Sequence, residues 1–137
     1  MRQIAYPHPE VLARMDSRVG ALPVILTVAV AMGIAAVLGL GSPARFGGVG
    51  WSVAFHWLPR PVWAFLFLMI AVAIVAACGV GREPLMWALR LSAVPWAFYA
   101  ASFAVAAFTR PDVSGSGAIS YGYIAAAYLV TAERFTP

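Results

Sequence analysis

The side chains able to carry out acid–base, nucleophilic or metal chemistry are few in this 137-residue chain, and they are scattered. They are His8, His56, Cys78, Glu10, Asp16, Glu83, Asp112 and Glu133. An active site needs a nucleophile near a base, and a metal centre needs clustered ligands. Neither spacing occurs, and Gly47, Gly48 and Gly50 form a loop without a phosphate-binding motif. We therefore expect no enzyme activity, no cofactor and no bound metal ion.

The charges divide the chain into long apolar pieces. Nine arginines and no lysine bound four stretches without charge, which are Val19 to Ala44, Pro61 to Gly81, Leu91 to Thr109 and Val113 to Ala132. A helix needs ~20 apolar residues to cross a hydrocarbon core about 30 Å thick. Charged residues make up 10% of the chain, whereas a soluble domain carries about 25%. The pattern predicts an all-α integral membrane four-helix bundle.

The predicted domain layout follows these stretches. Residues 1–18 form a polar N-terminal lead-in, 19–132 the four-span bundle and 133–137 a C-terminal tail, with spans at about 19–40, 61–81, 85–109 and 114–132. The first stretch is longer than a signal-peptide core, so we expect it to be retained. Residues 51–58 are predicted to form an interfacial segment between the first and second spans. The fourth stretch is the least hydrophobic, and partial insertion is its alternative.

Small side chains recur at four-residue intervals in three of the predicted spans. The candidate helix-packing residues are Ala31, Ala35, Gly39, Ala93, Ala97, Ala101, Ala118, Gly122 and Ala126. Small residues at this spacing let helix backbones approach closely in lipid. They could pack helices within one molecule or between copies, and the sequence leaves both open.

Aromatic and arginine side chains near the span ends are candidate membrane-interface anchors. They are Trp51, Trp57, Arg60, Trp63, Trp87 and Arg90. Tryptophan favours the headgroup layer, and a long arginine side chain can extend back to it from inside a span. Pro95, in the third span, predicts a helix kink.

The arginines also predict the orientation of the spans. Arg2, Arg14, Arg18, Arg82, Arg90 and Arg134 fall on the side of the termini, and Arg45, Arg60 and Arg110 fall on the other. The positive-inside rule therefore places both termini in the cytoplasm, in the cytoplasmic (inner) membrane. Because these charges lie at span ends and not in a basic stripe, nucleic acid is not an expected partner. The predicted partners are the lipid bilayer and a second copy or another membrane protein.

The C-terminal half resembles a known group of proteins. From Trp96 through Val130 it combines Phe98 and Tyr99, an Ala-rich helix, Pro111, a Ser/Gly run and the segment from Tyr121 to Tyr128. This order resembles small four-span membrane proteins of actinobacterial phages, many of which are thought to be holins. The chain lacks the Lys-rich cytoplasmic tail of many holins, and holins share no catalytic residues that could be transferred.

The resemblance implies a phage lysis protein that oligomerises and permeabilises the cytoplasmic membrane. The alternative is a membrane interaction protein that forms no pore, such as a phage exclusion factor or an accessory subunit of a membrane complex. Such a protein would have a fixed partner and no toxicity when made alone.

Overall fold

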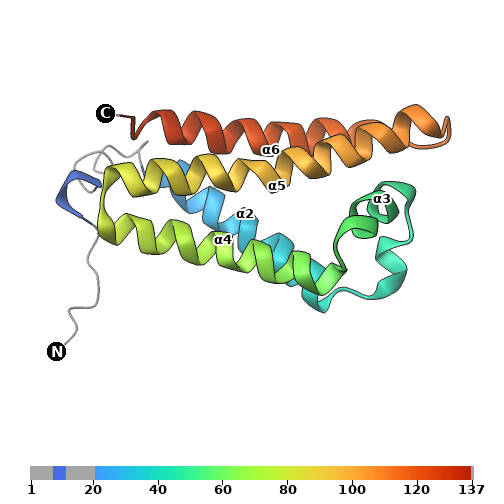
Figure 1. Cartoon of the computed structure of the whole chain (residues 1–137), viewed down its shortest axis with the longest axis horizontal. Helices are drawn as coiled ribbons and strands as arrows, with labels where there is room; N and C mark the ends of the chain where they lie inside the picture. The colour runs from blue at the N-terminus through green and yellow to red at the C-terminus, as the bar shows by residue number, and fades with distance from the viewer. Residues whose placement is uncertain (1–7, 12–20, 137) are drawn as a thin grey trace.

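The computed structural model describes residues 8–11 and 21–136, and over these residues the fold is all-helical, as predicted. Its long helices are α2 (Ala21–Leu40), α4 (Arg60–Val80), α5 (Arg82–Thr109) and α6 (Ser116–Glu133). A 3-10 helix, η1 (Pro43–Phe46), and a short helix, α3 (Val49–Trp57), lie between α2 and α4. The long helices alternate in direction, so α2 begins at the end of the molecule where α6 finishes (Figure 1).

The long helices associate as two antiparallel pairs, α2 with α4 and α5 with α6. The pairs meet mainly through α4 and α5, whereas α2 and α6 approach each other only slightly. A single residue, Gly81, separates α4 from α5. Its φ of 154° and ψ of −176° lie in a region essentially restricted to glycine, which permits so abrupt a reversal.

Helix α5 is longer than its neighbour α4, and α3 packs against α5. The 28 residues of α5 span about 42 Å at 1.5 Å per residue. Figure 1 shows α3 at the end of the molecule where α5 extends beyond α4. Gly50 and Ala54 of α3 are buried, while Ser52 and His56 are exposed. A short helix therefore forms where the interfacial segment was predicted, and its location at a membrane surface stays a prediction.

The surface of the long helices is largely apolar. Exposed large hydrophobic side chains occur on all of them, including Leu22, Ile25, Leu26, Phe65, Val72, Val75, Leu91, Val94, Ile119, Leu129 and Val130. Soluble monomers rarely expose so much contiguous apolar surface. Among the described residues, α2, α4 and α5 are long and apolar enough to cross a membrane. The chain is thus a membrane protein, and the crossing of α6 stays a prediction.

Helix α5 begins at Arg82, three residues before the predicted third span, and Pro84 lies in its first turn, where proline fits without penalty. The helix continues through Pro95. The kink predicted there stays a prediction.

Part of the predicted polar lead-in packs on the bundle. The His8 amide donates a hydrogen bond of 2.9 Å to the Cys78 carbonyl near the end of α4. Val11 is fully buried. The rest of the predicted lead-in, residues 1–7 and 12–18, lies outside the described residues.

Candidate functional site

The fold does not gather the candidates for chemistry that the structure describes into one cluster, and Asp16 lies outside the described residues. Within residues 8–11 and 21–136, no three His, Cys, Asp or Glu side chains are placed to hold a metal ion. His8 lies beside Cys78 and Gly81, where α4 turns into α5. His56 lies in α3, at the opposite end of α4. The distinctive features of the described chain are its packing and its surface.

An aromatic cluster connects α3, α4, α5 and α6 around the buried Tyr99. Its ring centroid lies 4.9 Å from that of Trp63, 5.5 Å from those of Trp51 and Tyr121, and 5.7 Å from that of Phe67. Aromatic pairs at such distances add about 0.5–1.5 kcal/mol beyond their buried area. The cluster therefore fixes α3 firmly onto the long helices.

Two of the predicted interface anchors belong to this cluster. Trp63 is only 4% exposed, and its Nε1 donates a 3.3 Å hydrogen bond to the carbonyl of Ala54. Trp51 is half-buried between rings of α3, α5 and η1. The structure places Trp63 inside the bundle, and not on the surface expected of an anchor, because it lies against the Phe98 and Tyr99 rings of α5.

Phe103 of α5 is enclosed by two glycines. A Cβ atom added to Gly50 of α3 or to Gly117 of α6 would overlap the Phe103 ring. Hydrogen is the only side chain that fits at either position without displacing the ring. These glycines therefore allow α3 and α6 to approach α5 from two directions.

Two other predicted anchors, Trp87 and Arg90, lie on the surface where α5 begins and α6 ends. Trp87 is 50% exposed, with the Arg90 guanidinium 5.4 Å from its ring centroid. Arg90 also forms a 2.8 Å ion pair with Glu133, at the last residue of α6. The hydrogen bond from Arg90, followed by its charge, lowers the pKa of the Glu133 carboxyl from its ordinary value. The pair connects α5 to α6.

At the opposite end, Arg60 connects α4 to α2. Its Nη1 donates a 2.8 Å hydrogen bond to the carbonyl of Gly41, just after α2, and its guanidinium lies 5.2 Å from the Phe46 ring centroid. Trp57, at the end of α3, is 70% exposed. Arg60 therefore connects the start of α4 to the end of α2 in the described structure. The side chain of Trp57 is free to contact lipid or water.

Two of the predicted packing residues of α2 point into the bundle, and the third lies near α4. Ala31 is fully buried and Ala35 is half-buried. A Cβ atom at Gly39 would lie 3.8 Å from the Cβ of Ala64 in α4, which is ordinary van der Waals contact. In this helix the small residues are used within the molecule.

On α5 and α6 most of the predicted packing residues turn outward instead. Ala93 is buried, but Ala97, Ala101 and Ala126 are exposed and Ala118 and Gly122 are half-exposed. A Cβ atom at Gly122 would meet nothing within 4 Å. Larger side chains such as Trp96, Tyr99 and Tyr128 fill the interior on these helices. Close backbone contact at Gly122 is therefore unused in the monomer.

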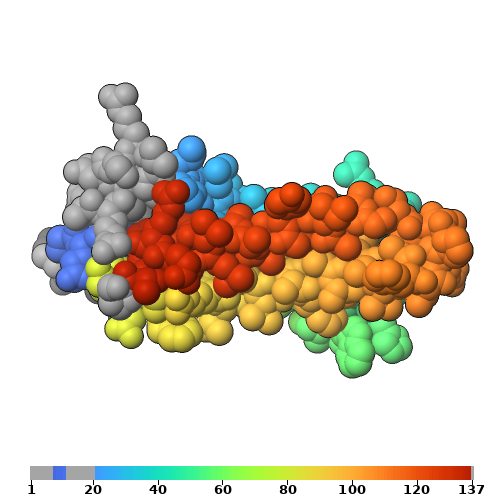
Figure 2. Space-filling view, turned by 90° about the horizontal axis from the view of Figure 1, so that it is seen from above, coloured from blue at the N-terminus to red at the C-terminus, as the bar shows by residue number. Residues whose placement is uncertain are grey.

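The outward face of α6, which we define as Ser116, Ser120, Gly122, Tyr123 and Ala126, is also unusually polar for a membrane helix. Ser116 and Ser120 are exposed, and Tyr123 is 74% exposed. The spacing of Ser116, Ser120 and Tyr123 places them on one side of the helix. Figure 2 shows one face of α6, across which no other described helix lies.

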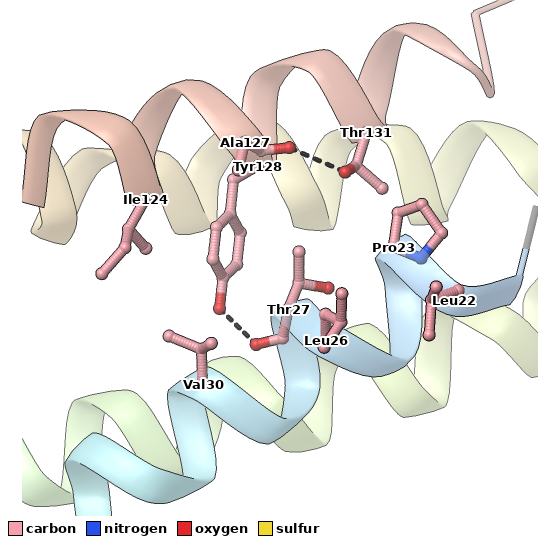
Figure 3. A pocket seen from close by; sticks show the side chains of 9 residues that line it. All are labelled: Leu22, Pro23, Leu26, Thr27, Val30, Ile124, Ala127, Tyr128 and Thr131. Carbon is pink, nitrogen blue, oxygen red and sulfur yellow. Dashed lines mark hydrogen bonds between the residues drawn. The ribbon is translucent and has the colours of Figure 1, made fainter. Parts of the chain in front are cut away.

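A groove between α2 and α6 has a volume of about 240 Å³ (Figure 3). Its lining residues are Leu22, Pro23, Leu26, Thr27, Val30, Ile124, Ala127, Tyr128 and Thr131. Deep in the groove the Tyr128 hydroxyl donates a hydrogen bond to the Thr27 carbonyl. We call this feature the α2/α6 groove.

The sequence reading missed this groove, although it held a signal. Tyr128 is a polar side chain within an Ala-rich span, and a polar side chain inside a membrane needs a hydrogen-bond partner. Its acceptor is the backbone carbonyl of Thr27, which no sequence pattern marks. Comparison of the chain with protein-family models, curated proteins and solved structures found no match.

Proposed function

We propose that this protein is a holin-like membrane protein that self-associates through the outward face of α6 and permeabilises the cytoplasmic membrane. The observation that carries the proposal is the exposure of Ser116, Ser120 and Tyr123 on a helix whose Gly122 has no neighbour. Lipid tails cannot satisfy hydroxyl groups, whereas a second helix or water in a lesion can. Gly122 and Ala126, which lie next to Tyr123 on the flank away from Ser116 and Ser120, would let that second helix approach closely.

The proposal is tested by tightly induced expression in a bacterial host, with membrane potential and culture density followed together. A holin-like protein accumulates without effect and then causes abrupt depolarisation and growth arrest. Normal growth, with the protein confirmed in the inner membrane, would contradict permeabilisation. That result would favour the alternative of an interaction protein that forms no pore.

Two glycine variants connect the expression experiment to the α6 face. Gly122→Leu covers the outward face of α6 and should delay or abolish depolarisation and reduce crosslinking between copies. Gly33→Leu is the matched control, because a Cβ atom at Gly33 of α2 also meets nothing within 4 Å. Exposed apolar side chains such as Met32 and Val37 surround Gly33, so leucine suits that site in lipid. Equal effects of the two variants would exclude the α6 face as the association surface.

A further inference from the structure

The hydroxyl of Tyr99 is a buried polar group that the packing leaves unpaired. Tyr99 is fully buried, and within the described part of the chain its hydroxyl has no hydrogen-bond partner. Nearly all buried polar groups in folded proteins are paired, so an unpaired one needs a physical reason. A hydroxyl that leaves water without forming a new hydrogen bond opposes its own burial. This one group therefore works against the packing that surrounds it.

Four aromatic rings surround that of Tyr99, and three of them belong to long helices. Trp63 and Phe67 come from α4, and Tyr121 comes from α6. The fourth ring, that of Trp51, comes from the short helix α3. Displacing any of the first three would separate long helices of the bundle. Displacing Trp51 requires movement of α3 alone, at one end of the molecule (Figure 1).

Helix α3 is joined to the long helices by little besides ring contacts. Over residues 8–11 and 21–136, one hydrogen bond connects it to them, from Trp63 Nε1 to the Ala54 carbonyl, and at 3.3 Å this bond is long. Exposed residues flank the helix, with Gly47 and Gly48 before it and Leu58 and Pro59 after it. A few residues at the ends of an element are enough to absorb a hinge motion.

From these observations we infer that α3 is a lid, which lifts from α5 about the residues on either side of it and admits water to the Tyr99 hydroxyl. The four long helices stay together while the lid opens. The ring contacts of Trp51 hold the lid closed in the described structure, and the unpaired hydroxyl favours the open position. The inference is independent of permeabilisation and of whether α6 crosses the membrane.

The test places a thiol under the lid of the full chain in detergent solution, in a Cys78→Ala background. Ala54 is fully buried on α3 and Ser52 is exposed on the same helix. A water-soluble maleimide should react slowly with Ala54→Cys and rapidly with Ser52→Cys. Ala71 of α4 is 2% exposed, and Ala71→Cys should stay unreacted because the long helices remain together. If Ala54→Cys does not fold, Phe55→Cys, half-buried on α3, replaces it.

Two outcomes of this comparison would overturn the lid. Complete protection of the thiol under α3 would mean that the helix does not lift. Equal reaction rates for Ala54→Cys and Ala71→Cys would mean that the whole bundle opens instead.

Tyr99→Phe tests the role of the hydroxyl, because it keeps the ring and removes the unpaired group. The closed lid then buries no unpaired hydroxyl, so the maleimide rate at Ala54→Cys should fall severalfold and the melting temperature should rise. Tyr123→Phe is the matched control, since Tyr123 is 74% exposed, and it should change neither quantity. A rate in Tyr99→Phe equal to or above that of the unaltered lid would contradict the inference.

Gly50→Ala moves the equilibrium in the opposite direction. A Cβ atom at Gly50 would overlap the Phe103 ring of α5, so the closed lid must shift, and the rate at Ala54→Cys should rise severalfold. Gly48→Ala is the matched control, because a Cβ atom there would lie 3.8 Å from Cδ1 of Trp51, in ordinary contact. If Gly50→Ala does not fold, Trp51→Phe loosens the lid by shrinking its central ring. An unchanged rate in the loosened lid would count against α3 as the moving element.

Discussion

At the scale of single residues, Tyr128 is the clearest link between α6 and α2. Its ring is buried against Trp96, with centroids 6.1 Å apart, and its hydroxyl donates to the Thr27 carbonyl. Tyr128→Phe keeps the ring and removes the hydrogen bond. We expect a loss of about 0.5–1.5 kcal/mol in the free energy of unfolding, the usual net value of such a bond. Unfolding in detergent, followed by tryptophan fluorescence, measures it.

Tyr123→Phe is the control for this prediction. Tyr123 belongs to the same helix, but it is 74% exposed. Removal of its hydroxyl should leave the stability of the monomer unchanged. If both variants lost the same stability, the effect of Tyr128→Phe could not be assigned to its bond with Thr27.

The glycines around Phe103 give a second prediction at this scale. Gly117→Ala adds a methyl group that overlaps the Phe103 ring, so the ring or α6 must move. Such overpacking costs about 1–3 kcal/mol. Gly122→Ala meets no neighbour within 4 Å, and alanine favours helix by up to about 1 kcal/mol over glycine. We therefore expect opposite shifts in melting temperature, and a stabilised Gly117→Ala protein would contradict the close contact.

The Arg90 and Glu133 pair gives a prediction about pH. Because Arg90 lowers the pKa of Glu133 in the folded protein, the pair stabilises the fold above the ordinary carboxyl pKa. This stabilisation is lost as the pH falls through the lowered value. Glu133→Gln should therefore narrow the difference in melting temperature between neutral and acidic detergent solution. The effect should be small because Glu133 is exposed, and an unchanged acid response would show that the pair does not contribute.

At the scale of elements, the sequence was most informative about the three most apolar helices. Long runs without charge, ended by arginine, glycine or proline, predict helices from length and hydropathy alone, and α2 and α4 lie almost entirely within such runs. Helix α5 contains such a run, Leu91 to Thr109, but begins nine residues before it, at Arg82. The position of α3 was harder to foresee. It depends on Trp51, Trp63 and Tyr99 meeting across three helices, and no local pattern encodes that meeting.

The small residues show the same limit of prediction from local sequence patterns. A four-residue spacing determines which side chains share one side of a helix, but not which side turns inward. On α2, Ala31 is buried against neighbouring helices, whereas on α5 Ala97 and Ala101 turn outward. The interior of α5 is filled by Trp96 and Tyr99, whose larger apolar surfaces gain more contact when buried.

Whether α6 crosses the membrane is the main prediction at this scale. The helix has 18 residues and would extend about 27 Å, which is close to the hydrocarbon thickness. We expect α6 to cross, since it lies antiparallel to the apolar α5 along its length. In a Cys78→Ala background, Ser114→Cys and Thr136→Cys place thiols just beyond the two ends of α6.

A membrane-impermeant maleimide added to intact cells should label Ser114→Cys and spare Thr136→Cys. Both should react after the cells are opened, which controls for thiol reactivity. Protection or labelling of both positions in intact cells would place the two ends of α6 on one side and leave three crossing helices.

At the scale of the whole molecule, the arginines mark two chemically different ends. Arg82 and Arg134 lie where α5 begins and α6 finishes, while Arg45 and Arg110 lie in η1 and just after α5, at the other end. Arg2, Arg14 and Arg18 lie outside the described residues, but their positive charges also count in the positive-inside balance when the chain inserts into the membrane. The balance favours a cytoplasmic location for the end where α5 begins and α6 finishes.

Reporters fused after Pro137 measure this orientation. Green fluorescent protein should fluoresce there and alkaline phosphatase should be inactive, because each folds into its active form on only one side of the membrane. Replacing Arg82 and Arg134 by glutamine should raise the fraction of active phosphatase, since it removes the bias that holds this end inside. Replacing Arg45 and Arg110 in the same way is the matched control, and should leave phosphatase inactive because it increases the bias. High phosphatase activity in the unaltered protein, together with maleimide labelling of Ser114→Cys only in opened cells, would mean that the bundle is inverted and that forces other than the arginine balance orient it.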